Sequence, residues 1–119
     1  MSAPLQPLLH DELIVLRAPT QVWSAADGVI GAAPIHGIAH SDVRVVRTLH
    51  WRVGGQPAEH LQTDEITADS VRIHGLLRHL DDPTPDPGVR VVLERAVDAT
   101  GVTETLTVTT RHDQAIDTT

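Results

Sequence analysis

Residues 41–57 alternate between two sets of side chains, and the rest of the expected fold is arranged around them. One set consists of Val43, Val45, Leu49, Trp51 and Val53, and the other of Arg44, Val46, Thr48, His50 and Arg52, with Arg47 as the exception. A period of two over eleven residues predicts a long, half-buried β-strand that places Trp51 in the core. The Gly54-Gly55 pair then predicts a tight hairpin turn, because glycine readily adopts positive φ angles. We therefore expect this stretch to be the central strand of a β-sandwich.

Further strands follow from shorter patterns on both sides of this stretch. The other strands expected are residues 12–18, 20–25, 58–61, 71–80, 89–97 and 102–110. The expected turns and loops are the Asp27-Gly28 turn before Val29-Ile30, a long loop at residues 31–40, a polar turn at 63–69 and a proline-rich loop at 81–88. This spacing predicts an all-β fold, an antiparallel β-sandwich of about seven or eight strands.

The chain divides into one domain with two short flanks. We expect residues 1–11 to be a loose leader, residues 12–110 to be the sandwich and residues 111–119 to be a polar tail. In the last strand, threonines alternate with Val102, Leu106 and Val108, which predicts a sheet edge with one apolar and one hydroxyl face. An exposed edge of this kind leads us to expect a homodimer.

Composition narrows the possible partners. The formal net charge is −7, so phosphate backbones and anionic membranes are repelled, and we expect neither as a partner. The core must be aliphatic, because Phe and Tyr are absent and there are only two Trp. The N-terminus lacks the basic and apolar regions of a signal peptide, and no stretch approaches the roughly 20 apolar residues of a membrane helix, so we expect a cytoplasmic protein.

Catalytic chemistry has only weak support in the sequence. Glycoside hydrolysis needs two carboxylates about 5–10 Å apart, and no two of the sixteen acids are paired by their spacing. His36 and His40 have metal-ligand spacing, but Pro34 and Gly37 predict a loop there instead of the helix that this spacing requires. We expect no cofactor and no metal, with a small metal-dependent β-barrel enzyme as the most distant alternative.

Four residues are candidates for binding: Trp23, His40, Asp42 and Arg44. Trp23 belongs either to the core or to an exposed platform on which a sugar ring stacks. Asp42 and Arg44 have a structural alternative, in which Asp42 accepts backbone N–H bonds where the strand begins and Arg44 pairs with a nearby acid.

Three motifs in order resemble the N-terminal domain of bacterial glycogen debranching enzymes of the amylo-α-1,6-glucosidase type. The central motif matches at Asp42, Arg44, Leu49, Arg52, Val53, Gly55 and Pro57. An upstream motif matches at residues 27–30 and 37–38, and a downstream hairpin matches at Arg95, Gly101, Glu104, Leu106 and Val108. The chain departs from the family pattern at Ala39, His40, Ser41, Val43 and Val45, where larger side chains are usual.

In that family the resembling domain is a β-sandwich that precedes an (α/α) barrel carrying the catalytic carboxylates. The resemblance thus implies a non-catalytic domain related to a glycoside hydrolase, with a structural or carbohydrate-associated role. It also implies an α-glucan or a catalytic glycosidase domain as the partner. The alternative is a stand-alone carbohydrate-binding module, whose binding of α-glucans would be lost on Trp23→Ala.

Overall fold

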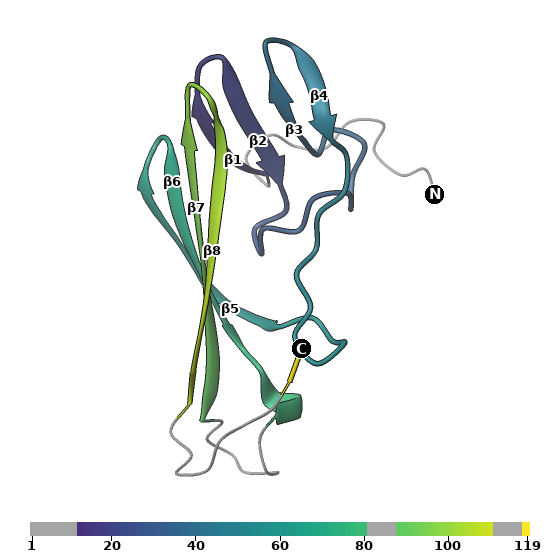
Figure 1. Cartoon of the computed structure of the whole chain (residues 1–119), viewed down its shortest axis with the longest axis vertical. Coiled ribbons are helices and arrows are strands. Elements are labelled where there is room, and N and C mark those ends of the chain that lie inside the picture. Colours follow the sequence, from purple (N-terminus) through teal and green to yellow (C-terminus); the bar gives the residue numbers. More distant parts are fainter. Residues whose placement is uncertain (1–11, 81–87, 111–117) are drawn as a thin grey trace, which may run out of the picture.

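The computed structural model describes residues 12–80, 88–110 and 118–119, and these residues form two four-stranded antiparallel sheets (Figure 1). The strands are β1 (Leu13–Arg17), β2 (Thr20–Ser24), β3 (Gly37–His40), β4 (Val43–Val46), β5 (Glu59–Thr67), β6 (Ser70–Leu76), β7 (Val89–Asp98) and β8 (Gly101–Thr110). Each sheet follows the chain order, β1-β2-β3-β4 and β5-β6-β7-β8. The predicted all-β, sandwich-like architecture is confirmed. The expected leader, most of the proline-rich loop and most of the tail lie outside the described residues.

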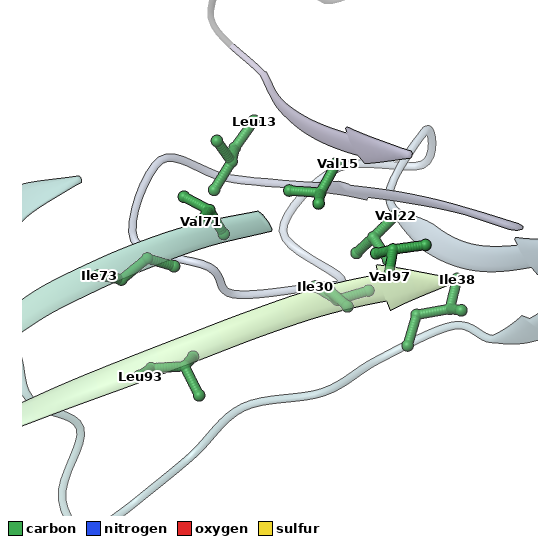
Figure 2. Close-up of a cluster of buried hydrophobic side chains, with 9 residues drawn as sticks. All are labelled: Leu13, Val15, Val22, Ile30, Ile38, Val71, Ile73, Leu93 and Val97. Carbon is green, nitrogen blue, oxygen red and sulfur yellow. The ribbon is translucent and has the colours of Figure 1, made fainter. Parts of the chain in front are cut away.

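An aliphatic core joins the first sheet to one half of the longer second sheet (Figures 1 and 2). Its buried members are Leu13, Val15, Val22, Ile30, Ile38, Val71, Ile73, Leu93 and Val97. Figure 2 shows these side chains pointing toward one another from both sheets. Each one buried contributes about 1.5–3 kcal/mol relative to an exposed side chain. The first sheet is therefore fixed over only part of the second.

A smaller apolar cluster covers the other half of the second sheet. It consists of Val53, Leu77, Val89 and Val91, with Leu80 and Leu106 packed against it. These residues come from the segment that connects the two sheets, from β7 and β8, and from the end of β6 with the short 3-10 helix (Arg78–Leu80) that follows it. The backbone N–H of Gly54 also donates to the carbonyl of Thr119, which ties the connection to the end of the chain.

The prediction of a long central strand at residues 41–57 is wrong. Only Val43–Val46 forms a strand, β4, and the chain then crosses from the first sheet to the second. Trp51 is 44% exposed instead of lying in the core, and Val43 and Val45 are more than 60% exposed. The Gly54-Gly55 turn is confirmed, with φ angles of 63° and 78°.

Three further boundaries differ from the prediction. The expected loop at 31–40 contains β3, and the expected turn at 63–69 lies largely within β5, which continues to Thr67. The strand expected at 71–80 ends at Leu76 because the 3-10 helix follows it. The hairpin of β7 and β8 matches its prediction closely, and β8 is an edge strand of its sheet.

Candidate functional site

An apolar cleft of about 270 Å³ lies between the second sheet and the segments that connect the strands of the two sheets. Its walls are the turn at residues 27–29, the crossing segment at 49–53 and the first residues of β5. Its floor is the inner face of the second sheet, formed by Ile73, Gly75, Val91, Leu93 and Leu106. His74 of β6 also lines the cleft, and its Nε2 lies 3.0 Å from Oδ2 of Asp64. Because the rest of the floor is apolar, the cleft favours an apolar group over a charged one.

Two glycines allow the backbone to pass close to the floor of the cleft. A Cβ atom at Gly28 would lie 2.7 Å from Cδ1 of Ile73, and the φ of Gly28 is +85°. A Cβ atom at Gly75 would lie 3.0 Å from the Cβ of Ala58. Larger residues at either position would force the walls apart, so the dimensions of the cleft depend on both glycines.

Polar side chains stand around the mouth of the cleft. His50, Trp51 and His60 line it, and Trp51 exposes 44% of its surface. The hydroxyl of Thr63 donates to the carbonyl of Ala26 at 2.5 Å, so Nε2 of His60, 2.8 Å from the same hydroxyl oxygen, must be the donor to it. These bonds connect β5 to the turn that forms the opposite wall.

A buried ion pair holds the turn at residues 27–29, which forms one wall of the cleft. The side chain of Arg95 is 1% exposed and that of Glu104 is 9% exposed, and Nε of the arginine donates to Oε1 of the glutamate at 2.8 Å. The same guanidinium donates to Oγ of Ser24 at 3.2 Å and to the carbonyl of Gly28 at 2.7 Å. The second oxygen of Glu104 accepts from Nε1 of Trp51 at 2.5 Å. One buried arginine thus links both sheets, and its partner glutamate fixes the indole at the mouth.

The four predicted binding residues do not converge on one site. Trp23 is half-buried on the outer face of the first sheet, where its Nε1 donates to Oε1 of Gln21 at 2.9 Å. His40 lies at the other end of the β2–β3 pairing, with Nδ1 2.9 Å from the hydroxyl of Thr20. Trp23 is thus neither fully in the core nor an open platform.

The backbone explains the position of the other two candidates. Ser41 and Asp42 have φ angles of 50° and 66° and form the turn between β3 and β4. Asp42 therefore lies in the turn just before β4, whereas Arg44 lies on β4 itself. Within the described residues, Arg44 donates from Nη2 to the carbonyl of Pro34 at 3.0 Å instead of to an acid.

His36 has a local structural role. It is 2% exposed, and its Nδ1 accepts the backbone N–H groups of Gly31 and Ala33 at 3.2 and 3.4 Å. The proton of the neutral ring is therefore on Nε2, which lies 2.6 Å from a carboxylate oxygen of Glu12. The ring holds the loop before β3 against the residue that precedes β1. Within the described ranges, no group of three or more His, Cys, Asp or Glu side chains is placed to hold a metal ion.

Four carboxylates accept hydrogen bonds that lower their pKa values. The pKa values of Glu59, Asp64, Asp69 and Asp98 all lie below their ordinary values. The largest cause in each case is a side-chain donor, namely Arg78, Gln62, Thr67 and Thr100 in that order. A glycosidase acid needs a raised pKa, so these four groups are shifted in the direction opposite to that role.

A surface that sequence reasoning missed runs beside the cleft. We define the basic-apolar segment as residues 43–52; it exposes three apolar side chains and three arginines, Val43, Val45, Trp51, Arg44, Arg47 and Arg52. It carries one third of the nine basic residues of a chain whose net charge is −7, and no acid occurs from residue 43 to residue 58. This local excess of arginine could have indicated an exposed surface. It was overlooked because the apolar residues of the segment were assigned to a half-buried strand.

Comparison with protein families gives one match that covers most of the chain. The model of the N-terminal domain of some glycogen debranching enzymes matches residues 15–119. Comparisons with curated proteins and with solved structures give no significant match. No helix among the described residues is long and apolar enough to cross a membrane. The match includes the crossing segment, the Arg95–Glu104 pair and every strand except the first two residues of β1, and the chain belongs to the family of N-terminal domains of glycogen debranching enzymes.

Proposed function

We propose that this chain is a non-catalytic accessory domain of a debranching-type glycosidase and that its basic-apolar segment docks onto the catalytic domain. The exposure of this segment is the observation that carries the proposal. Val43, Val45 and Trp51 expose between 44% and 62% of their surfaces. Covering these side chains together with the adjacent cleft would remove apolar surface from water, which is the main driving force of association.

The charges of the basic-apolar segment indicate which kind of partner surface would bind it. Arg47 and Arg52 are exposed on the same segment as the apolar side chains. A partner surface with apolar groups at its centre and carboxylates around them would satisfy both sets of groups. Tryptophan and arginine are also the residue types that most often dominate binding energy at protein interfaces. The partner is therefore a protein surface of acidic and apolar character.

The engagement of the carboxylates supports a non-catalytic role. Glu104 is committed to a buried arginine, and Glu12 to a buried histidine. The pKa values of Glu59, Asp64, Asp69 and Asp98 are lowered, whereas a group that donates a proton to a leaving group needs a raised pKa.

An α-glucan partner receives less support from the geometry. Sugar recognition combines an aromatic platform with hydrogen bonds to hydroxyl groups. The aliphatic floor of the cleft offers no such bonds, and the ring N–H of Trp23 is already satisfied by Gln21. Glucan binding is therefore the alternative that experiment must distinguish from docking.

Calorimetric titration tests the docking proposal. The 119-residue chain is titrated with a separately produced catalytic domain of a glycogen debranching enzyme, and the double variant Arg47→Glu/Arg52→Glu is compared with it. We expect the double variant to bind at least about tenfold more weakly, because it places like charges opposite each other. The control is Arg90→Glu, which reverses an exposed charge on the outer face of β7; it should bind as the parent chain does.

Two further measurements distinguish the alternatives. Glucose release from a branched α-glucan by this chain alone would overturn the non-catalytic assignment. Co-sedimentation with glycogen, lost on Trp23→Ala and combined with no binding to the catalytic domain, would replace docking by a carbohydrate-binding function. Equal binding by the double variant and the control would remove the basic-apolar segment from the interface.

A further inference from the structure

The two sheets have four edge strands, and β8 differs from the other three. β8 pairs with β7 over ten successive residue pairs without a register shift. It contains no proline and five threonines, and its one charged residue, Glu104, points inward to Arg95. β8 therefore carries none of the usual features that keep an exposed edge from pairing, namely outward charges, bulges, proline or short length.

The remaining edges each carry such a feature. β5 has three acids, Glu59, Asp64 and Glu65, and two register shifts against β6. β4 has only four residues and a register shift against β3. β1 has five residues, and the backbone N–H of Leu16 on its edge already donates to the carbonyl of Ala68 at 2.9 Å. Long, regular and uncharged edge backbone is thus confined to β8 among the described strands.

We propose that β8 is a homodimer interface, in which two copies pair antiparallel along this edge and join their second sheets into one eight-stranded sheet. A second copy fits because the strand is self-complementary. Two-fold antiparallel pairing places one residue opposite its own copy, and side chains that face each other lie on the same side of the sheet. Centring the pair on Thr105 places Thr103 opposite Thr107 on the outer face and Val102 opposite Val108 on the inner face.

Charge supports this register and this partner. With Thr105 at the centre, Glu104 faces Leu106 and does not meet its own copy. Each chain has a net charge of −7, so approach through most of the surface is repulsive. At the edge of β8 two copies can meet without placing like charges opposite each other, and threonine pairs across antiparallel strands are favourable. Because strand pairing alone buries little surface, the dimer should be weak and concentration-dependent.

Sedimentation velocity over a concentration series tests the proposal on the full chain. We expect the parent chain to shift toward twice the monomer mass as concentration rises into the high micromolar range. Thr105→Lys places two ammonium groups opposite each other and should remain monomeric. The matched control is Ala96→Lys, which adds the same charge to the same outer face on β7, one strand away from the edge; it should dimerise as the parent chain does.

Hydrogen exchange distinguishes edge pairing from other modes of association. Alternate N–H groups of β8 point away from β7, so protection that increases with concentration should appear at every second residue of the strand. A urea midpoint for Thr105→Lys close to that of Ala96→Lys excludes unfolding as the cause of a lost dimer. The proposal is overturned by a parent chain that stays monomeric, or by a dimer disrupted by Ala96→Lys and unaffected by Thr105→Lys.

Discussion

Replacing Glu104 by leucine should destabilise the fold more than removing any exposed acid. Both side chains of the Arg95–Glu104 pair are almost completely buried, so the substitution leaves the guanidinium charge of Arg95 without its counterion. Breaking a buried pair in this way costs about 3–5 kcal/mol. A domain of this size has about 5–15 kcal/mol of unfolding free energy in total, so the loss is a large fraction of it.

Urea denaturation measures this loss directly. With a slope of about 1.5 kcal/mol per molar urea, the midpoint of Glu104→Leu should fall by about 2–3 M. The matched control is Glu94→Leu, because Glu94 pairs with Arg72 at 3.0 Å on the exposed outer face of the same sheet. An exposed pair contributes about 0–1 kcal/mol, so the control midpoint should fall by less than about 0.7 M.

A double variant separates the lost counterion from simple loss of packing. In Arg95→Met/Glu104→Leu the buried charge is gone, and the main remaining cost is the unsatisfied carbonyl of Gly28, about 1–3 kcal/mol, since Ser24 still donates to the carbonyl of Ala25 and Trp51 is partly exposed to water. The double variant should therefore be more stable than Glu104→Leu alone. A single variant that loses less than about 1 kcal/mol, or a double variant less stable than the single one, would refute the reasoning.

Three further predictions concern turns and close contacts. The pKa of Asp98 is lowered because a threonine hydroxyl and two backbone amides of its own turn donate to it. The ionised carboxylate therefore stabilises the folded state above the unfolded-state pKa, and this stabilisation is lost as pH falls. Asp98→Asn should flatten the fall of the urea midpoint between about pH 5 and pH 3. Gly28→Ala should cost about 1–3 kcal/mol, because the new methyl group meets an isoleucine of β6, whereas Gly101→Ala meets nothing within 4 Å and should leave the thermal midpoint within a few degrees of the parent. Replacing Ser41-Asp42 by Asn-Gly should raise stability by about 0.5–1 kcal/mol, because both positions have positive φ; a lower urea midpoint would contradict that explanation.

The parts of the fold that the sequence predicts well are those with one buried and one exposed face. In β7, buried residues alternate with more exposed ones along the whole strand. Such strands are recognisable because burial on one face imposes a strict period of two. One of the three motifs of the family resemblance lies in the hairpin of β7 and β8, and the family is confirmed over residues 15–119.

Polar edge strands are recognised less well. β5 was missed over most of its length because its residues are exposed or only half-buried throughout, so nothing in its composition distinguishes it from a loop. Its hydrogen bonds to β6 define it as a strand, and those partners lie across the hairpin. A strand at a sheet edge can thus be as hydrophilic as a turn.

The sequence contains evidence of the buried ion pair, but hydrophobic periodicity alone does not reveal it. Arg95 interrupts the apolar face of β7, and Glu104 interrupts the apolar face of β8. Two opposite charges on facing positions of adjacent apolar strand faces indicate a buried pair, because an isolated buried charge is too costly to retain. The register brings these two residues directly opposite each other.

The crossing segment shows why alternation could not identify the site. An extended chain places successive side chains on opposite sides whether or not it pairs with a neighbour, so the pattern of residues 43–53 is compatible with both states. Long-range contacts decide between them: the bridge from Leu49 to Ile30, the bond from Trp51 to Glu104 and the packing of Val53 beside Leu77. These contacts hold the segment across the two sheets, with its indole fixed by the buried ion pair. The basic-apolar segment is therefore ordered before any partner arrives, which reduces the entropy cost of docking.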